Sequence, residues 1–275
     1  MKYGYTINNK LMANSDGKLL SVDPYNPLNL PPNTIRVRTN DGQPPVNGFY
    51  DSATLVEGTT DVYDVYKGND FYATFGDSTN VIEVLGANSE GITGARSMFN
   101  GCTALSSVPS FDTSKVTDME QMFEDCTSLT TAPYLDTSNV RDMFQTFKDC
   151  VSLTSVPLYD TSKIDAGVVG LMNTFANCKS LISVPLFDTS NIEFMFSTFK
   201  NCSSLSAIPL FNTSKLKAID AVFENCVNVQ SGALALYQQA SSQTNVPGHT
   251  NTFSNCGINT QTGSAELAQI PDDWK

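Results

Sequence analysis

The amino-acid sequence predicts an α/β solenoid with short parallel strands and short helices. It would be preceded by a small β-rich N-terminal region and closed by a helical C-terminal cap. Seven cysteines recur at intervals of 24, 28 or 30 residues, and each lies three residues after a phenylalanine. A repeat of this length is typical of solenoids, whose units bury their apolar faces only against neighbouring units. The pairs expected to form the structural core are Phe99/Cys102, Phe123/Cys126, Phe147/Cys150, Phe175/Cys178, Phe199/Cys202, Phe223/Cys226 and Phe253/Cys256.

Each repeat has the pattern of a helix followed by a strand. The apolar residues from Met119 to Cys126 are spaced i, i+3, i+4 and i+7, as on one face of a helix. Residues 103–108 are expected to form a short parallel strand that ends at Pro109, because proline has no N–H to donate to a neighbouring strand. An Asp-Thr-Ser triplet follows the proline in most repeats, and it suits an Asx turn or a helix N-cap.

Four regions are expected along the chain. They are a proline-containing N-terminal arm (1–32), a β-rich N-terminal domain or cap (33–91), the repeats (92–229), and a C-terminal cap that includes a last degenerate repeat (230–275). In the second region, β-rich runs separated by Gly, Asn and Asp predict strands at 34–39, 53–57, 62–67, 71–75 and 81–85.

Two departures from the period predict local features. The fourth repeat is four residues longer than its neighbours, and residues 165–170 are the expected inserted loop. After Val229 the strand-and-proline pattern is lost. Residues 232–240 then predict a helix with Ser231 as its N-cap, and residues 265–270 predict a last half-turn.

Charge and composition argue against several classes of function. Sixteen Lys and Arg against 28 Asp and Glu give a net charge of −12. This leaves no basic stripe for nucleic-acid phosphates, and it would repel an anionic membrane surface. No stretch approaches the ~18 apolar residues of a membrane span, and the first residues have no apolar core of a secretory signal. We therefore expect neither nucleic-acid binding nor membrane insertion.

An enzyme is also not expected. His249 is the only histidine, and it occupies the repeat position of Met119, which favours a packing or surface role. The sequence has no nucleophile elbow, no phosphate-binding glycine loop and no dinucleotide-binding motif. We therefore expect no catalytic residues, no cofactor and no resident metal.

The regularly spaced cysteines have two interpretations. Zinc sites use close pairs such as Cys-x-x-Cys whose ligands converge on a point, whereas these seven thiols would form a line. Their odd number argues against complete disulfide pairing. Free cysteine is among the most buried residue types, so we expect seven reduced, buried thiols.

An acidic residue begins most of the Asp-Thr-Ser triplets. Carboxylates are ligands that calcium prefers, so a calcium-binding column is one alternative. The other is that each carboxylate accepts a hydrogen bond from its own following backbone, as in an Asx turn. The fifth copy keeps this hydrogen bond and loses the charge, which favours the Asx turn. The positions are Asp112, Asp136, Asp160, Asp188 and then Asn212.

A pair of residues, mostly apolar, lies between the proline and the aspartate of each repeat. Adjacent residues of an extended segment point to opposite sides, so one member of each pair could face outward. The second members would then form a candidate binding stripe for a glycan or a partner protein, made of Phe111, Leu135, Tyr159, Phe187 and Phe211. The alternative is that both columns are covered, because a large exposed apolar patch is rare on a monomer.

The pattern from Met119 to Ser138 is Met-x-x-Met-Phe-x-x-Cys-x-x-Leu-x-x-x-Pro-x-x-Asp-Thr-Ser. It resembles the BspA-like leucine-rich repeat of bacterial surface proteins, over residues 92–256. The resemblance implies a leucine-rich-repeat fold and a role as an adhesin or host-protein binder. Residues 34–39 together with 83–88 resemble a leader found beside such repeats in proteins of gut bacteria and their phages.

Two functions from different classes are expected. Members of the resembled family carry an export signal, whereas Met1 begins a polar segment. A phage protein would need no export signal, because it is assembled in the host cytoplasm and released when the host lyses. Unpaired cysteines agree with folding in a reducing compartment.

The first expectation is therefore a non-enzymatic component of a phage virion surface, a fibre or decoration subunit that presents its repeats to a host surface protein or glycan. Residues 1–32 would attach it to a capsid or tail protein, as a homotrimer by analogy with phage fibres. The alternative is a bacterial cell-surface adhesin domain that binds host proteins.

Overall fold

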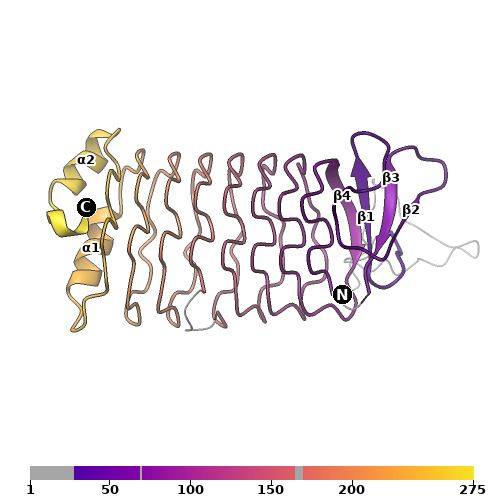
Figure 1. Cartoon of the computed structure of the whole chain (residues 1–275). Helices are drawn as coiled ribbons and strands as arrows, with labels where there is room; N and C mark the ends of the chain where they lie inside the picture. The colour runs from indigo at the N-terminus through magenta and orange to yellow at the C-terminus, as the bar shows by residue number, and fades with distance from the viewer. Residues whose placement is uncertain (1–27, 69, 165–169) are drawn as a thin grey trace, which may run out of the picture.

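The computed structural model describes residues 28–68, 70–164 and 170–275. Figure 1 shows a small sheet at one end, then a row of narrow coils of similar shape, then two short helices at the other end. The expected N-terminal arm (1–32) lies outside the described residues except for 28–32. The expected inserted loop (165–170) lies outside them except for Gly170.

The N-terminal sheet is antiparallel throughout, with the strand order β2-β3-β1-β4. Its strands are β1 (Thr34–Thr39), β2 (Ser52–Leu55), β3 (Val62–Tyr66) and β4 (Val81–Asn88). Val37 pairs with Tyr63 on one side and with Val84 on the other, and all three side chains are buried. Four of the five expected strands are therefore present. Residues 71–75 do not form a strand, because Ala73 has a left-handed φ of 48° and the N–H groups alternate between the following coil, as from Phe71 to Gly94 O (3.2 Å), and a turn within the segment, as from Thr74 to Phe71 O (3.3 Å).

The fold class expected from the sequence, an α/β solenoid of short parallel strands and short helices with a helical cap, is wrong. Within the described residues the only sheet is antiparallel, and the only α-helices are α1 (Ala233–Ser241) and α2 (Gln261–Leu267). A 3₁₀ turn, η1 (Asp272–Trp274), follows them. Apart from β4 and α1, the described coils between residues 71 and 256 contain turns and isolated parallel bridges of single residue pairs, such as Asp118↔Asp142.

Left-handed residues prevent the expected helices in the coils. Gln121 and Asp125 have φ angles of 56° and 60°, and a right-handed helix cannot continue through such residues. Backbone donors then alternate between two partners: Phe123 donates to Thr146 O in the next coil (2.8 Å), whereas Cys126 donates three residues back to Phe123 O (3.1 Å). A series of such turns also brings every third or fourth residue inward, which explains the helix-like apolar spacing.

The segments after each cysteine are extended but too short to form strands. Thr154 donates its N–H to Thr130 O in the preceding coil (2.9 Å). Pro157 follows three residues later and has no N–H to extend the ladder. What is left is a single bridge between Thr131 and Ser155.

A column of stacked rings forms the centre of the coils, with neighbouring ring centroids 5.2–6.2 Å apart. Burying one such side chain contributes about 2–3 kcal/mol. Phe75 belongs to this column, and Ser78 stands where later coils have cysteine, so the coils begin one repeat upstream of Phe99. The column consists of Phe75, Phe99, Phe123, Phe147, Phe175, Phe199, Phe223, Phe253 and Trp274.

The helix expected at 232–240 is present as α1, but Ser231 is not its N-cap. The N-cap is Gly232, with a φ of 100° and no side-chain hydrogen bond of its own. A side chain here would collide with the carbonyl oxygen of Ile208, 2.2 Å from the position of its Cβ. Glu266 of α2 instead accepts the N–H of Leu234 (3.1 Å), and its negative charge suits a helix N-terminus.

Candidate binding surface on the coils

The candidate binding stripe is buried, so the hypothesis that it faces outward is wrong. Its members Phe111, Leu135, Tyr159, Phe187 and Phe211 are between 1% and 4% exposed. The rings of Tyr159, Phe187 and Phe211 widen the aromatic core, because they lie parallel to rings of the central column, with centroids 6.1, 5.9 and 5.9 Å away. In each pair the residue before the buried one points the opposite way and is exposed.

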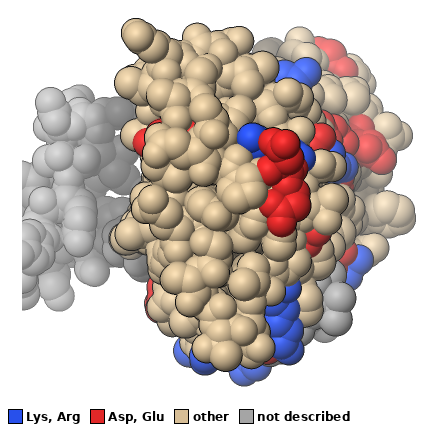
Figure 2. Space-filling model, turned by 90° about the vertical axis from the view of Figure 1, so that its left-hand side faces the viewer, with Lys and Arg blue, Asp and Glu red and all other residues tan. Residues whose placement is uncertain are grey.

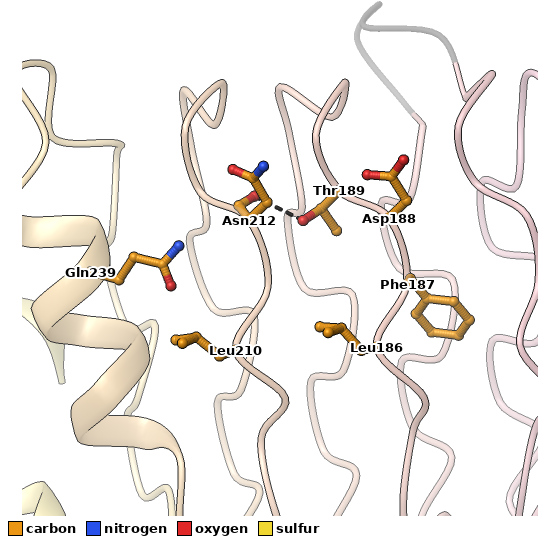
Figure 3. Close-up of a pocket in the computed structure, with 7 residues that line it drawn as sticks. All are labelled: Leu186, Phe187, Asp188, Thr189, Leu210, Asn212 and Gln239. Atoms are coloured by element: carbon orange, nitrogen blue, oxygen red, sulfur yellow. Dashed lines mark hydrogen bonds between the residues drawn. The ribbon is translucent and has the colours of Figure 1, made fainter.

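The first members of the pairs therefore face solvent. Tyr134, Leu158, Leu186 and Leu210 are 64%, 63%, 60% and 55% exposed, and we call these four residues the apolar column. Ser110 is exposed at the same position one coil earlier. Figure 3 shows Leu186 and Leu210 in neighbouring coils with their side chains on the same face. Soluble proteins seldom expose several large apolar side chains next to one another, and such a patch marks an interaction site.

The aspartates that follow the apolar column form Asx turns. In each, Oδ1 accepts the N–H of the residue two positions later, at 2.9–3.0 Å, and Asn212 does the same at 2.9 Å. Hydrogen bonds from Ser162 lower the pKa of Asp160, and those from Ser190 lower the pKa of Asp188. Among the described residues, no three His, Cys, Asp or Glu side chains are grouped to hold a metal ion. The Asx turns account for this column, which comprises Asp112, Asp136, Asp160 and Asp188, without calcium.

The cysteines lie in the core beside the aromatic column. All fourteen Phe and Cys side chains of the seven pairs are at most 1% exposed. The thiols carry no disulfide, and most donate to the carbonyl of the Phe one coil earlier, as from Cys126 to Phe99 O (3.1 Å). Burial raises the pKa of every one of these thiols, to about 12 for Cys256. They are therefore neutral, packed side chains.

An open cavity of about 600 Å³ lies at the C-terminal end of the apolar column, where α1 faces the last coils. Gln239 projects from α1 toward the coil that carries Leu210 and Asn212, as Figure 3 shows. The complete lining is Leu186, Phe187, Asp188, Thr189, Leu210, Asn212 and Gln239.

Gln239 is the unusual member of this lining. Its Oε1 is buried and has no hydrogen-bond partner within the described part of the chain. The amide could be turned round, but its Nε2 would then be the buried atom without a partner. Leaving such an atom unpaired costs about 1–3 kcal/mol. Because Oε1 has almost no solvent-accessible surface, a ligand in the cavity can pair with it only if the side chain turns toward the cavity.

A second open cavity, of about 470 Å³, lies on a different column and lacks such an unpaired atom. It is lined by Asn177, Asn201 and Asn225 together with Lys179, Ser203 and Val227. The asparagine amides bond to one another, from Asn201 to Asn177 (2.7 Å) and from Asn225 to Asn201 (2.8 Å). These groups already satisfy each other, so this cavity is a weaker candidate.

Charge is sparse at the C-terminal end of the molecule. Figure 2, which looks onto this end, shows a largely uncharged surface with acidic and basic side chains gathered toward one side.

In the described ranges, no helix has the length and apolar character needed to cross a bilayer.

Sequence reasoning missed the cavity because its parts are far apart in the chain. In the sequence, the residues of the apolar column are distinguished only as the first members of the pairs between proline and aspartate. Gln239 is one of several polar residues in an expected helix. Nothing in the local sequence indicates that α1 turns this side chain toward Asn212, 27 residues earlier.

Three overlapping stretches of the chain match one family model, described as "Mycoplasma protein of unknown function, DUF285". They are residues 69–167, 135–233 and 169–256, and together they cover more than half of the chain. The first match begins at the coil of Phe75, and the last ends at Cys256. Among curated proteins, no match is found.

Proposed function

Because this chain belongs to the Mycoplasma-type family of repeat-containing surface proteins, which includes the BspA-like repeats, we propose that it is a non-enzymatic adhesion protein. It is displayed on a cell surface and binds a host protein or glycan through the apolar column.

The observation that carries this proposal is the exposure of the apolar column. Four large apolar side chains in successive coils are each more than half exposed, although the residue that follows each of them is buried. Covering one of them with a partner would contribute on the order of 1–2 kcal/mol. A partner that lies along the coils and covers all four would gain several such contributions at once.

The state of the only histidine supports a non-enzymatic role. The His249 ring stacks on Trp274 with centroids 4.1 Å apart, and its Nδ1 lies 2.7 Å from Pro247 O. Its Nε2 is 3.5 Å from Asp273. The ring is thus held in packing contacts at the end of the aromatic column, and no nucleophilic side chain is among these neighbours.

A second candidate is display on a phage virion, with residues 1–32 as the attachment segment to a capsid or tail protein. The observation that favours it is the set of seven buried thiols without a disulfide. Proteins that fold in oxidising compartments commonly use disulfides, whereas particles assembled in a cytoplasm fold under reducing conditions.

The test is adhesion of beads coated with the full chain to cultured epithelial cells. The test variant replaces Tyr134, Leu158, Leu186 and Leu210 with serine. The matched control replaces Ile182 and Ile258 with serine, because they are similarly exposed, at 54% and 48%, but lie off the column. We expect the column variant to lose adhesion and the control to keep it. Equal adhesion of both variants would contradict the proposal.

Location is tested separately by labelling with antibody raised against the chain. Label on intact cells of the source organism supports the cell-surface proposal. Label confined to purified phage particles supports the virion candidate instead.

A further inference from the structure

We infer that the cavity between α1 and the last two members of the apolar column binds a neutral sugar ring. This inference rests on the proposed function, because it names the class of ligand for one end of the same surface. It goes beyond that function by assigning a defined subsite and the role of each polar group in it.

The apolar part of the subsite is provided by Leu186 and Leu210. They lie in neighbouring coils, are 60% and 55% exposed, and point the same way across the groove (Figure 3). One face of a pyranose ring carries mainly C–H groups, and two aligned leucine side chains offer a surface on which that face can pack. The cavity, at about 600 Å³, lies within the usual range of small-ligand sites.

Three planar polar side chains surround this apolar surface, and each has hydrogen-bonding capacity left. Asp188 accepts from the N–H of Ser190 (2.9 Å) and from its side chain, but an ionised carboxylate has about four acceptor positions, so it can accept further bonds. Asn212 uses Oδ1 to accept from Ser214 N (2.9 Å), which leaves its NH₂ group as a donor. The Gln239 side chain lines the cavity and its buried Oε1 has no partner among the described residues, so a turn of the side chain brings this acceptor to a ligand without breaking a hydrogen bond of Oε1.

The mixture of donor and acceptors selects the class of ligand. A sugar hydroxyl both donates and accepts, so neighbouring hydroxyls can satisfy Asp188, Asn212 and Gln239 together. The hydrogen bonds from Ser190 lower the pKa of Asp188, which keeps this carboxylate ionised and disfavours an acidic sugar or a phosphate. A lysine or arginine side chain would use the two acceptors but would leave the Asn212 donor unused.

The experiment measures saturation-transfer NMR on the full chain with the methyl glycosides of glucose, galactose, mannose and N-acetylglucosamine. Gln239→Leu removes the unpaired acceptor, and Gln238→Leu is the matched control, because Gln238 is the preceding residue of α1, is exposed and does not line the cavity. Asp188→Asn is compared with Asp160→Asn, which changes the equivalent Asx turn one coil away from the cavity. The melting temperature of each variant shows whether it is folded.

We expect at least one glycoside to bind. Gln239→Leu should weaken this binding about tenfold, as for the loss of one buried hydrogen bond, and Gln238→Leu should not. Asp188→Asn should weaken binding and Asp160→Asn should not. Absence of binding by all four glycosides overturns the inference, as does equal binding by the Gln239 and Gln238 variants. Saturation transfer to a lysine-rich peptide, with none to the glycosides, overturns it in favour of a basic protein partner.

A negative result for the sugar subsite can be distinguished from a negative result for the adhesion proposal. Tyr134 and Leu158 lie on the apolar column but outside the cavity lining. If replacing these two with serine abolishes bead adhesion while no glycoside binds, the adhesion proposal stands and the sugar subsite is wrong. If a glycoside binds and the column variants adhere normally, the subsite stands and the adhesion proposal is wrong.

Discussion

Phe123 and Phe147 lie one repeat apart, with ring centroids separated by 5.2 Å and ring planes 6° from parallel. This is the shortest spacing along the column that runs from Phe75 to Trp274. Parallel rings at this separation are offset-stacked, and such pairs contribute about 0.5–1.5 kcal/mol beyond the burial of their area. The column thus ties the coils together where helices and strands are absent.

Replacing a ring in the middle of this column should be costly. Phe147→Ala or Phe199→Ala should lower the free energy of unfolding by about 3–5 kcal/mol, as for other buried aromatic residues. Phe253→Ala should cost less, because its neighbouring ring centroids are 6.2 Å away on both sides, against 5.2 and 5.6 Å for Phe147. Urea denaturation of the three variants measures these differences. Equal losses of unfolding free energy at all three positions would contradict the weaker stacking expected at Phe253.

The repeat and its core were predictable from the sequence, but the secondary structure within it was not. Apolar spacing reports which side chains point inward, and both a helix and a series of tight turns give the spacing from Met119 to Cys126. A distinguishing signal was present: the residue before each Cys is Gly, Asp or Asn, the types most tolerant of a left-handed backbone. These residues, which all have positive φ, are Gly101, Asp125, Asp149, Asn177, Asn201, Asn225 and Asn255.

The orientation of the pairs between Pro and Asp was harder to predict. Alternation shows that the two residues face opposite ways, but Leu158 and Tyr159 are both apolar. Only Ser110, a polar residue at the outer position of its coil, indicated which member is exposed. In three of the pairs an aromatic ring faces inward and extends the ring column, as Tyr159 does beside Phe147, whereas in another pair Leu135 is buried and Tyr134 is exposed.

The left-handed asparagines give a second prediction. Asn201 has a φ of 62° and donates to Asn177 Oδ1 at 2.7 Å. Asn201→Ala loses this hydrogen bond and the one that Asn201 Oδ1 accepts from Asn225 (2.8 Å), and it also strains the backbone, so it should cost about 3 kcal/mol. Asn201→Gly loses the same two hydrogen bonds without the strain and should cost less. Chemical denaturation compares the two, and a glycine variant that is less stable than the alanine variant would contradict the role given to the backbone.

The buried thiols should make the fold sensitive to alkaline pH. Burial raises the pKa of Cys256 from 9.0 to about 12, and it raises those of the other six as well. An unfolded chain loses these protons near pH 9, whereas the folded chain keeps them. The stabilisation is therefore complete below pH 9 and is lost as the pH rises toward the folded-state values.

The urea midpoint, measured from pH 7.5 to 11, should fall progressively above pH 9. Cys202→Ser removes one of the titrating groups and keeps a hydroxyl donor for Phe175 O, so its midpoint should fall less steeply. A midpoint independent of pH in this range would mean that the thiols are not buried. The native protein should also resist alkylation until it is unfolded.

The Asx turns predict indifference to calcium. Asp160 accepts the N–H of Ser162 at 2.9 Å, so Asp160→Asn, which keeps this bond as Asn212 does, should be nearly neutral. Asp160→Ala should cost about 1 kcal/mol, because it removes the bond. Neither calcium nor EDTA should move the melting temperature of the parent protein. A rise in melting temperature with calcium that is lost in Asp160→Asn would establish a metal site instead.

Steric blocking of single positions tests whether the apolar column is the binding face. Cysteine is introduced in place of Leu158, on the column, or of Ile258, off the column, and is coupled to a maleimide-linked polyethylene glycol. The native thiols are buried and should not react. We expect beads carrying the chain modified at position 158 to lose adhesion to epithelial cells by about tenfold or more, equivalent to about 1.4 kcal/mol. Beads carrying the chain modified at position 258 should adhere normally. Undiminished adhesion with the polymer at position 158 would contradict the claim.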